Sequence, residues 1–272
     1  MSQLVVDIKR HFFFVRIAKI NKKIFIPNFI NDLLVLPIKF LLLCIVWFAI
    51  YNAMHVESLN GFSLWDIILY YFAFATIMYI TMYYRQLPFT VWNEVTKGEI
   101  SKFVCRPISY LKYHFFYGLG YTYYGAIFCL PIIIISLLCF FPGSAWVLNL
   151  IFFLVSIFGG IIITYNVYML IGLLAFWTES IFGYRDLILH LGAIMAGSVI
   201  PLSFLPDKIQ FISKIMPFRY MVYEPICILF NHYSLKGIMI TIVYQIVYLG
   251  VISVVTKFVW RMGLRRYEAQ GG

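Results

Sequence analysis

The sequence contains stretches without any charged residue that are too long for an ordinary segment of a soluble protein. Asp, Glu, Lys and Arg are absent from Tyr113 to Thr178, and further uncharged stretches run from Ile67 to Tyr84 and from Gly237 to Thr256. About 20 apolar residues suffice for a helix to cross the hydrocarbon core of a bilayer. With 63% hydrophobic and only 12% charged residues, the chain has too little polar surface to bury such stretches in water. The sequence therefore predicts an integral membrane protein.

Six apolar runs are long enough to span the membrane. They are continuous rather than alternating, which favours helices over the strands of a barrel. We expect an all-α fold of six transmembrane helices, with spans at Leu33 to Met54, Leu64 to Tyr84, His114 to Phe140, Ala145 to Trp177, Leu187 to Pro206 and Gly237 to Trp260. The fourth run exceeds one span, so we expect it to tilt or to continue beyond the membrane.

The distribution of basic residues predicts the orientation. If both termini are cytoplasmic, 17 of the 21 Lys and Arg residues lie on the cytoplasmic side, as the positive-inside rule expects. We expect three parts: a cytoplasmic segment 1–32, a transmembrane domain 33–260 and a cytoplasmic tail 261–272. Residues 1–32 lack the pattern of a cleaved signal peptide, so this segment is expected to be retained.

The N-terminal segment has the pattern of an amphipathic helix lying in the membrane interface. Basic residues are frequent in it, while Leu4, Ile8, Phe12 and Val15 fall close to one helical face. Asn28 to Asp32 would then form the turn into the first span.

The segment 201–236, between the fifth and sixth spans, carries four of the ten prolines at Pro201, Pro206, Pro217 and Pro225. Proline at this density interrupts helices repeatedly, and the residues between the prolines are largely apolar. The pattern favours short helices that re-enter the bundle from outside. A surface loop is the alternative.

The loop 85–112 contains the longest charged stretch between spans on the predicted cytoplasmic side, within "WNEVTKGEISKFVCRPISYLKY". Its charged residues alternate in sign among apolar residues spaced for a short amphipathic helix, which indicates either a solvated loop or a docking surface for a partner. Gly98 permits a sharp bend, and Pro107 prevents a helix from continuing past Arg106. The candidate coupling residues are Glu94, Lys97, Gly98, Glu99, Arg106 and Pro107.

Several classes of chemistry have no support in the sequence. The spans lack the ionisable residues that ion-coupled transporters use, and HExxH, GxSxG and phosphate-binding GxxxxGK[ST] motifs do not occur. The five cysteines are scattered, and the histidines are isolated, which favours packing roles over a metal site. We predict neither an enzyme nor a cofactor or metal site in this chain, and no binding of nucleic acid.

The fifth span contains two interleaved pairs of small residues, Gly192 with Ala196 and Ala193 with Gly197. Such pairs let another helix approach closely. They favour ordinary packing within the chain, with a subunit interface or a translocation pathway as alternatives.

Three stretches together resemble the permease subunits of type-2 ABC exporters. These are "TKGEISKFVCRPISY" after the second span, "FWTESIFGYRDL" with "GSVIPLSFLPDKIQFISKIMPFRYMVYEPI" around the fifth, and the tail "WRMGLRRYEAQGG". The shared patterns are G-x-[IL]-x6-P, P-x4-P followed by P-F-R-Y, and G-x-x-x-Y-E. More narrowly, the chain is similar to a bacterial six-helix subgroup with separately encoded ATPases. Val104, where leucine is more usual, departs from the pattern.

The resemblance implies a function and partners. It places the six candidate coupling residues at or near a coupling helix that fits a groove of the ATPase, which would itself bind ATP and magnesium. It further implies a second permease chain, identical or related, a pathway at the dimer interface lined by the second and fifth spans, and a bacterial cytoplasmic membrane.

We therefore expect the permease subunit of an ATP-driven exporter. The uncharged, aromatic spans favour a hydrophobic or amphipathic solute. A channel or facilitator, and a membrane protein that binds a peptide for immunity without transporting it, are the alternatives.

Overall fold

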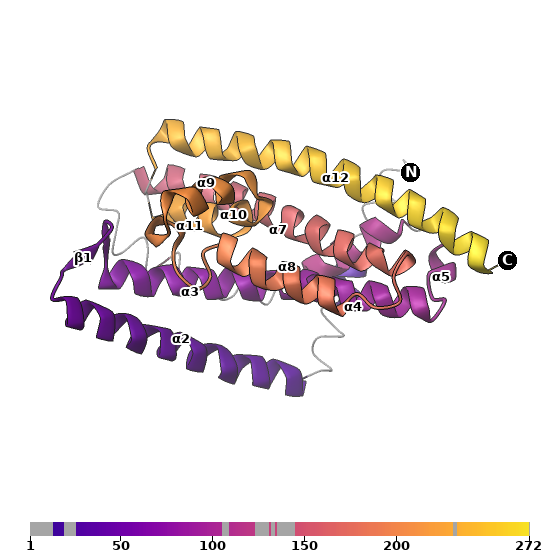
Figure 1. The fold of residues 1–272 in the computed structure, drawn as a ribbon, viewed down its shortest axis with the longest axis horizontal. Coiled ribbons are helices and arrows are strands. Elements are labelled where there is room, and N and C mark those ends of the chain that lie inside the picture. Colours follow the sequence, from indigo (N-terminus) through magenta and orange to yellow (C-terminus); the bar gives the residue numbers. More distant parts are fainter. Residues whose placement is uncertain are drawn as a thin grey trace. The chain divides into compact units, whose positions relative to one another are not determined.

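The computed structural model describes residues 13–18, 26–104, 109–122, 131, 134, 145–230 and 233–271, and they are largely helical (Figure 1). The chain forms two compact units, Met1–Ile80 with Leu111–Pro142, and Thr81–Tyr110 with Gly143–Gly272. An all-α fold was predicted. The described residues depart from it only in a two-stranded antiparallel hairpin, β1 (Ser58–Leu59) with β2 (Phe62–Ser63).

In the first unit, helix α2 (Ile26–Met54) leads through this hairpin into α3 (Leu64–Ile80). The two helices contact each other, with the rings of Phe40 and Phe72 5.9 Å apart. The end of α2 agrees with the predicted first span, but its start does not. The helix includes residues 28–32, so the turn predicted there is wrong, because Pro27 in the first helical turn is compatible with helix rather than ending it.

The N-terminal helix expected at the membrane interface is described only at residues 13–18, which are helical. There Ala18 packs against the helical residues 110–122. A Cβ added to Gly120 would lie 2.5 Å from the Cβ of Ala18, so the glycine is needed for this approach. Leu4, Ile8 and Phe12 of the predicted apolar face lie outside the described residues.

Helix α7 (Ala145–Leu173), continued by the 3-10 turn η1 (Leu174–Phe176), is the centre of the second unit. It contacts α4 (Met82–Thr96), α10 (Pro217–Met221), α11 (Tyr223–Leu229) and α12 (Leu235–Gly271). Two glycines of α7 allow the backbones to approach. A Cβ at Gly172 would lie 2.8 Å from the Cβ of Val91 on α4, and one at Gly160 would lie 2.7 Å from the carbonyl oxygen of Met221 on α10.

Among the described residues, three helical segments are long and apolar enough to cross a membrane: Leu64–Thr96, Val147–Phe176 and Leu235–Tyr267. They coincide with the predicted second, fourth and sixth spans, and the second and sixth are longer than predicted. The Phe40–Met54 part of α2 is a shorter apolar helix. Most of the predicted third span lies outside the described residues.

The predicted fifth span, Leu187 to Pro206, is not one continuous helix. Helix α8 (Phe182–Met195) has 14 residues, about 21 Å at 1.5 Å per residue, which is short of the roughly 30 Å hydrocarbon core. It stops because Gly197 takes a left-handed conformation with a φ of 73°, and the amide of Ser198 donates to the carbonyl oxygen of Ala193 at 3.0 Å. This is the Schellman arrangement that closes helix C-termini.

Short helices follow α8, as the spacing of the prolines predicts. They are η2 (Leu202–Phe204), α9 (Asp207–Ile215), α10 and α11. The residues of α11 are all buried, and α10 and α11 pack against α7. The expectation of a plain surface loop is therefore wrong for α10 and α11.

Candidate functional site

The bend expected at Gly98 is present and has defined geometry. Helix α4 ends there in a second Schellman arrangement, with Gly98 at a φ of 72°. The amide of Glu99 donates to the carbonyl oxygen of Glu94 at 2.8 Å, and that of Gly98 donates to the carbonyl oxygen of Val95 at 3.2 Å. The chain then enters the four-residue helix α5 (Ser101–Val104). We refer to residues 97–101 as the Gly98 turn.

Aromatic rings from three separate segments pack behind this turn. The ring of Tyr110 stacks on Trp260 of α12, with centroids 4.4 Å apart and planes 2° from parallel, and meets the ring of Phe103 edge-on at 5.0 Å. Phe176 of η1 contacts both Trp260 and Tyr267 of α12. We call these five residues the aromatic support.

A glycine near the end of α12 allows this helix to pack closely against the aromatic support. A Cβ at Gly263 would lie 2.3 Å from the ring of Phe176, so only glycine allows this approach. The same helix brings the Tyr267 hydroxyl oxygen to 3.5 Å from the position of a Cβ on Gly98. Residues 261–271, which were predicted as a tail, continue the helix and pack against the loop.

A partly buried hydrogen bond joins the loop to the end of α4. The Tyr110 hydroxyl donates to the Glu94 carboxylate. Burial raises the pKa of Tyr110 well above its usual value, and the nearby Glu94 carboxylate raises it further, so the phenol stays protonated and remains a donor. Glu94 is half-buried and therefore has a structural role in addition to the surface role predicted for it.

The end of α4 is also attached to the segment before α8. The indole Nε1 of Trp92 donates to the carbonyl oxygen of Glu179 at 2.9 Å, and the Trp92 ring meets that of Phe182 at 5.2 Å. The Gly98 turn is thus held by contacts on α4, η1, the start of α8 and α12.

The remaining candidate coupling residues face solvent or are not described. Lys97 is exposed, and the half-buried Glu99 pairs with the exposed Lys102 at 3.2 Å. Arg106 and Pro107 lie outside the described residues. Our sequence reasoning missed the aromatic support, although Gly263 and Tyr267 form the G-x-x-x-Y pattern of the C-terminal stretch and lie one helical turn apart.

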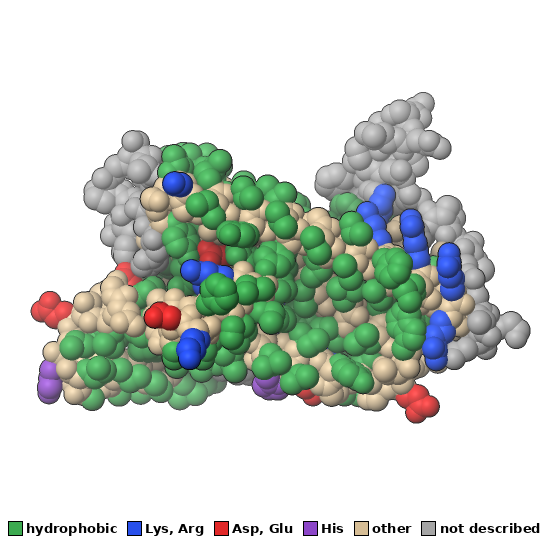
Figure 2. Space-filling view, turned by 45° about the horizontal axis from the view of Figure 1, so that its top comes forward, with side chains coloured by type: hydrophobic (Ala, Val, Ile, Leu, Met, Phe, Trp, Pro, Cys, Tyr) green, Lys and Arg blue, Asp and Glu red, His purple; other side chains and the backbone are tan. Residues whose placement is uncertain are grey.

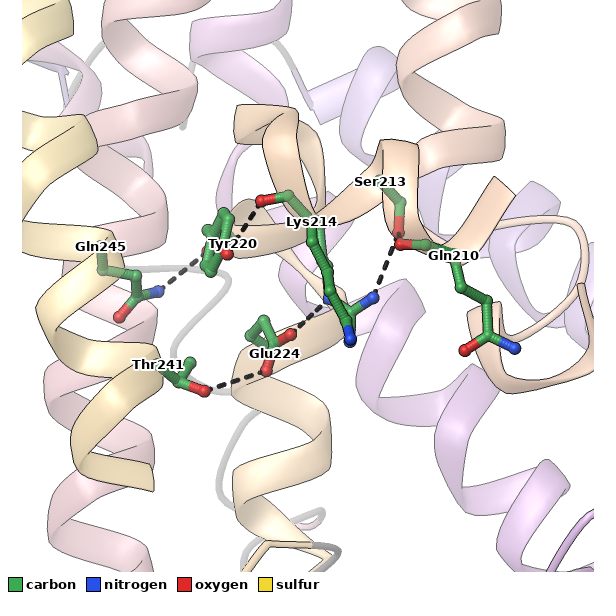
Figure 3. A network of polar contacts seen from close by, with 8 residues as sticks. Gln210, Ser213, Lys214, Tyr220, Glu224, Thr241 and Gln245 are labelled. Atoms are coloured by element: carbon green, nitrogen blue, oxygen red, sulfur yellow. Dashed lines mark hydrogen bonds and ion pairs between the residues drawn. The ribbon is translucent and has the colours of Figure 1, made fainter. Parts of the chain in front are cut away.

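A second group of polar residues is buried among the short helices, and our sequence reasoning did not predict it (Figure 3). Arg219 of α10 donates to Glu224 of α11, and both side chains are less than one tenth exposed. Arg219 also donates to the hydroxyl of Ser213 on α9 at 3.1 Å, and Thr241 of α12 donates to Glu224 at 3.3 Å. Burial lowers the pKa of Arg219, but the Glu224 carboxylate raises it by more, so the guanidinium stays charged.

Gln245 extends this network to the centre of the unit. Its side-chain amide donates to the carbonyl oxygen of Tyr220 on α10 at 2.9 Å and to that of Ser156 on α7 at 3.1 Å. Figure 3 shows Gln245 directed toward Tyr220 from the neighbouring helix. Five helices, α7, α9, α10, α11 and α12, are thus joined through polar groups that would be costly to bury unpaired. A search for ionisable residues alone overlooks Gln245, since it is neutral.

The small residues of the predicted fifth span have different positions. Gly192 is buried, and a Cβ there would lie 2.8 Å from the ring of Phe218 on α10, so it serves packing within the chain. Ala193 and Gly197 do not form a small-residue pair on one helix, because Gly197 lies past the end of α8 and Ala193 accepts the terminating hydrogen bond. Ala196, the last member, is buried at the C-cap.

The Gly98 turn can present charged residues to a partner while being held rigidly from behind. The buried network can hold short helices in place. Within the described ranges, no group of three or more His, Cys, Asp and Glu residues could hold a metal ion.

The sequence matches the model of one family, described as ABC-2 family transporter protein, over residues 36–271. A search of curated proteins finds no matching sequence.

Proposed function

The chain belongs to the ABC-2 family of transporter proteins, and on that premise we propose that it is the permease subunit of an ATP-driven exporter. It is a membrane-embedded, multi-pass protein. The family implies association with an ABC ATPase, which is where we place ATP, magnesium and hydrolysis. We further propose a second permease chain, identical or related, a bacterial cytoplasmic membrane and cytoplasmic termini.

The geometry of the Gly98 turn supports a coupling role for this loop. The turn presents the exposed Lys97 and the half-buried Glu99, and the exposed Lys102 follows it on α5. Its back is fixed to the helices by Tyr110 on Trp260 and by the Tyr110–Glu94 hydrogen bond. Because the turn is fixed to these helices, it cannot move independently of them. A movement of the bound ATPase would therefore displace the turn together with α4 and α12. This rigid attachment is the observation that carries the proposal.

The short helices α9, α10 and α11 are proposed to line the outer side of the transmembrane bundle. Burial of α11 and its contact with α7 support a re-entrant position for this region. A hydrophobic or amphipathic solute is proposed as cargo, because the described spans Val147–Phe176 and Leu235–Tyr267 are strongly apolar.

The proposal is tested by reversing exposed charges of the loop. The full-length chain, tagged, is purified from its own cells in mild detergent together with its ATPase. We expect the variant Lys97→Glu/Lys102→Glu to lose most of the co-purifying ATPase and the substrate-stimulated hydrolysis, while Lys208→Glu/Lys214→Glu on α9 keeps both. Glu94 is left unchanged, since it accepts the Tyr110 hydrogen bond.

A channel or facilitator makes the opposite prediction. If the purified chain alone moved a solute across liposomes, or if the loop variant transported normally without bound ATPase, the exporter proposal would be wrong.

A further inference from the structure

Three basic residues near the end of α12 share one face of the helix. Lys257, Arg261 and Arg265 are spaced four residues apart, and all three are exposed. Residues at this spacing lie one above the other on a helix. Arg266, also exposed, lies beside them. We call Lys257, Arg261 and Arg265 the basic stripe.

The other side of the same helix faces the interior of the unit. Thr256 and Gly263 are buried there, and Trp260 and Tyr267 contact Phe176. The basic stripe therefore points away from the helices that α12 packs against. In the space-filling view, Lys and Arg side chains gather toward the right of the face drawn, while apolar side chains cover most of its remainder (Figure 2).

In the part of the chain whose side chains are described, no acidic residue neutralises the positive charge of the basic stripe. No acidic residue whose side chain the structure describes forms an ion pair with Lys257, Arg261 or Arg265. Like charges four residues apart on a helix repel. The helix dipole does not stabilise these charges either. It favours basic residues only within the last turn of a helix, and the last turn of α12 contains none.

The position of the stripe along α12 indicates what lies beside it. On α12, most of the exposed side chains between Met239 and Val255 are apolar, including Val247, Val251 and Val254, and the exposed Phe258 lies beside Lys257. In a membrane-embedded chain such a face contacts lipid tails. The stripe follows this apolar face along the helix and extends for about 12 Å, at 1.5 Å per residue, with the exposed Phe258 and Met262 among its residues. The basic side chains are therefore continuous with the apolar surface of the helix.

We propose that the basic stripe binds the headgroups of anionic phospholipids. The negative headgroup phosphates compensate the repulsion between the three basic side chains, and the acyl tails lie along the apolar face around Phe258. Bound lipid holds the end of α12 whose other side carries Trp260, Gly263 and Tyr267. The proposal does not depend on which partner binds the Gly98 turn.

The test is a binding titration on the full-length chain in a neutral detergent, with a fluorescently labelled phosphatidylglycerol as the probe. Removing charges in Lys257→Gln/Arg261→Gln/Arg265→Gln is expected to weaken binding by roughly fivefold for each charge, on the order of 100-fold in total. The matched control Lys208→Gln/Lys214→Gln, which removes exposed charges from α9, is expected to bind as the unchanged chain does. Arg261→Lys/Arg265→Lys keeps the charge and is expected to bind within about threefold.

Unchanged phosphatidylglycerol affinity in the triple variant would overturn the proposal, as would equally tight binding of phosphatidylcholine by the unchanged chain. If the triple variant kept its lipid affinity but lost its ATPase subunit, the stripe would be a protein contact and the proposal wrong. If that variant does not fold, the salt dependence of lipid binding to the unchanged chain is the test. Raising ionic strength from about 50 to about 500 mM must then weaken lipid binding to the unchanged chain more than tenfold, and salt-independent binding would count against the stripe.

Discussion

At the scale of single residues, the backbone of Gly98 restricts the choice of side chain at the centre of the loop. Its φ of 72° costs a residue with a Cβ about 1–2 kcal/mol, although the space around the glycine is open enough for a methyl group. We expect Gly98→Ala to lower the free energy of unfolding by about that amount, measured by thermal unfolding in detergent.

Gly250→Ala on α12 is the matched control. A Cβ at Gly250 would have no neighbour within 4 Å and the residue is helical, so this change should be neutral or stabilise by up to about 1 kcal/mol. If both variants unfolded at the same temperature, the left-handed conformation at Gly98 would not be what restricts the turn.

The buried pair Arg219–Glu224 gives a second prediction at this scale. Removing one partner leaves a buried charge without compensation, so Arg219→Met should cost about 3–5 kcal/mol. The double variant Arg219→Met/Glu224→Leu removes both charges and should recover a large part of that loss. Unfolding curves of the two variants test this, and a double variant less stable than the single one would contradict it.

At the scale of helices, α12 is fixed to η1 by the approach of Gly263 to Phe176. Gly263→Ala places a Cβ 2.3 Å from the ring, which must move, so we expect a loss of about 1–3 kcal/mol. Combining it with Phe176→Leu should relieve the clash. A double-mutant cycle by thermal unfolding should give a coupling energy above about 0.5 kcal/mol, and additivity would mean that the two residues do not meet.

The sequence predicted the boundaries of helices that coincide with long apolar runs. It did not predict boundaries that depend on one backbone conformation or one hydrogen bond. The predicted fourth span begins at Ala145 and ends within a residue of η1, because no charged residue interrupts the run. The fifth was overextended, because the run continues past Gly197 while the backbone does not. Hydropathy contains no information about a backbone φ angle or about the hydrogen bond that ends a helix.

The candidate site shows the same division. The bend at Gly98 followed from glycine's conformational freedom, whereas the stacking of Tyr110 on Trp260 joins residues 150 positions apart and has no local signal. The Arg219–Glu224 pair was visible as two charges within an apolar stretch, but its burial depends on the fold of α10 and α11.

At the scale of the whole molecule, the proposed topology places the Gly98 turn and helix α9 on opposite sides of the membrane. In a variant whose five cysteines are replaced, a cysteine introduced at Ser101 should react with a membrane-impermeant maleimide only after the cells are opened. One introduced at Lys208, which is exposed, should react in intact cells. Labelling of both positions in intact cells would rule out cytoplasmic termini with six spans.

Helix α12 runs unbroken from Leu235 to Gly271, about 55 Å at 1.5 Å per residue. Near its start Thr241 and Gln245 bond to Glu224 and Tyr220, and near its end Trp260 stacks on Tyr110. A straight α-helix is stiff along its axis, so an axial shift at one end arrives at the other with little loss. The helix can therefore transmit an axial movement from one end to the other. A slip of one helical turn, about 5.4 Å, would have to break the hydrogen bond to Glu224 and the stacking of Trp260 on Tyr110 in a single event.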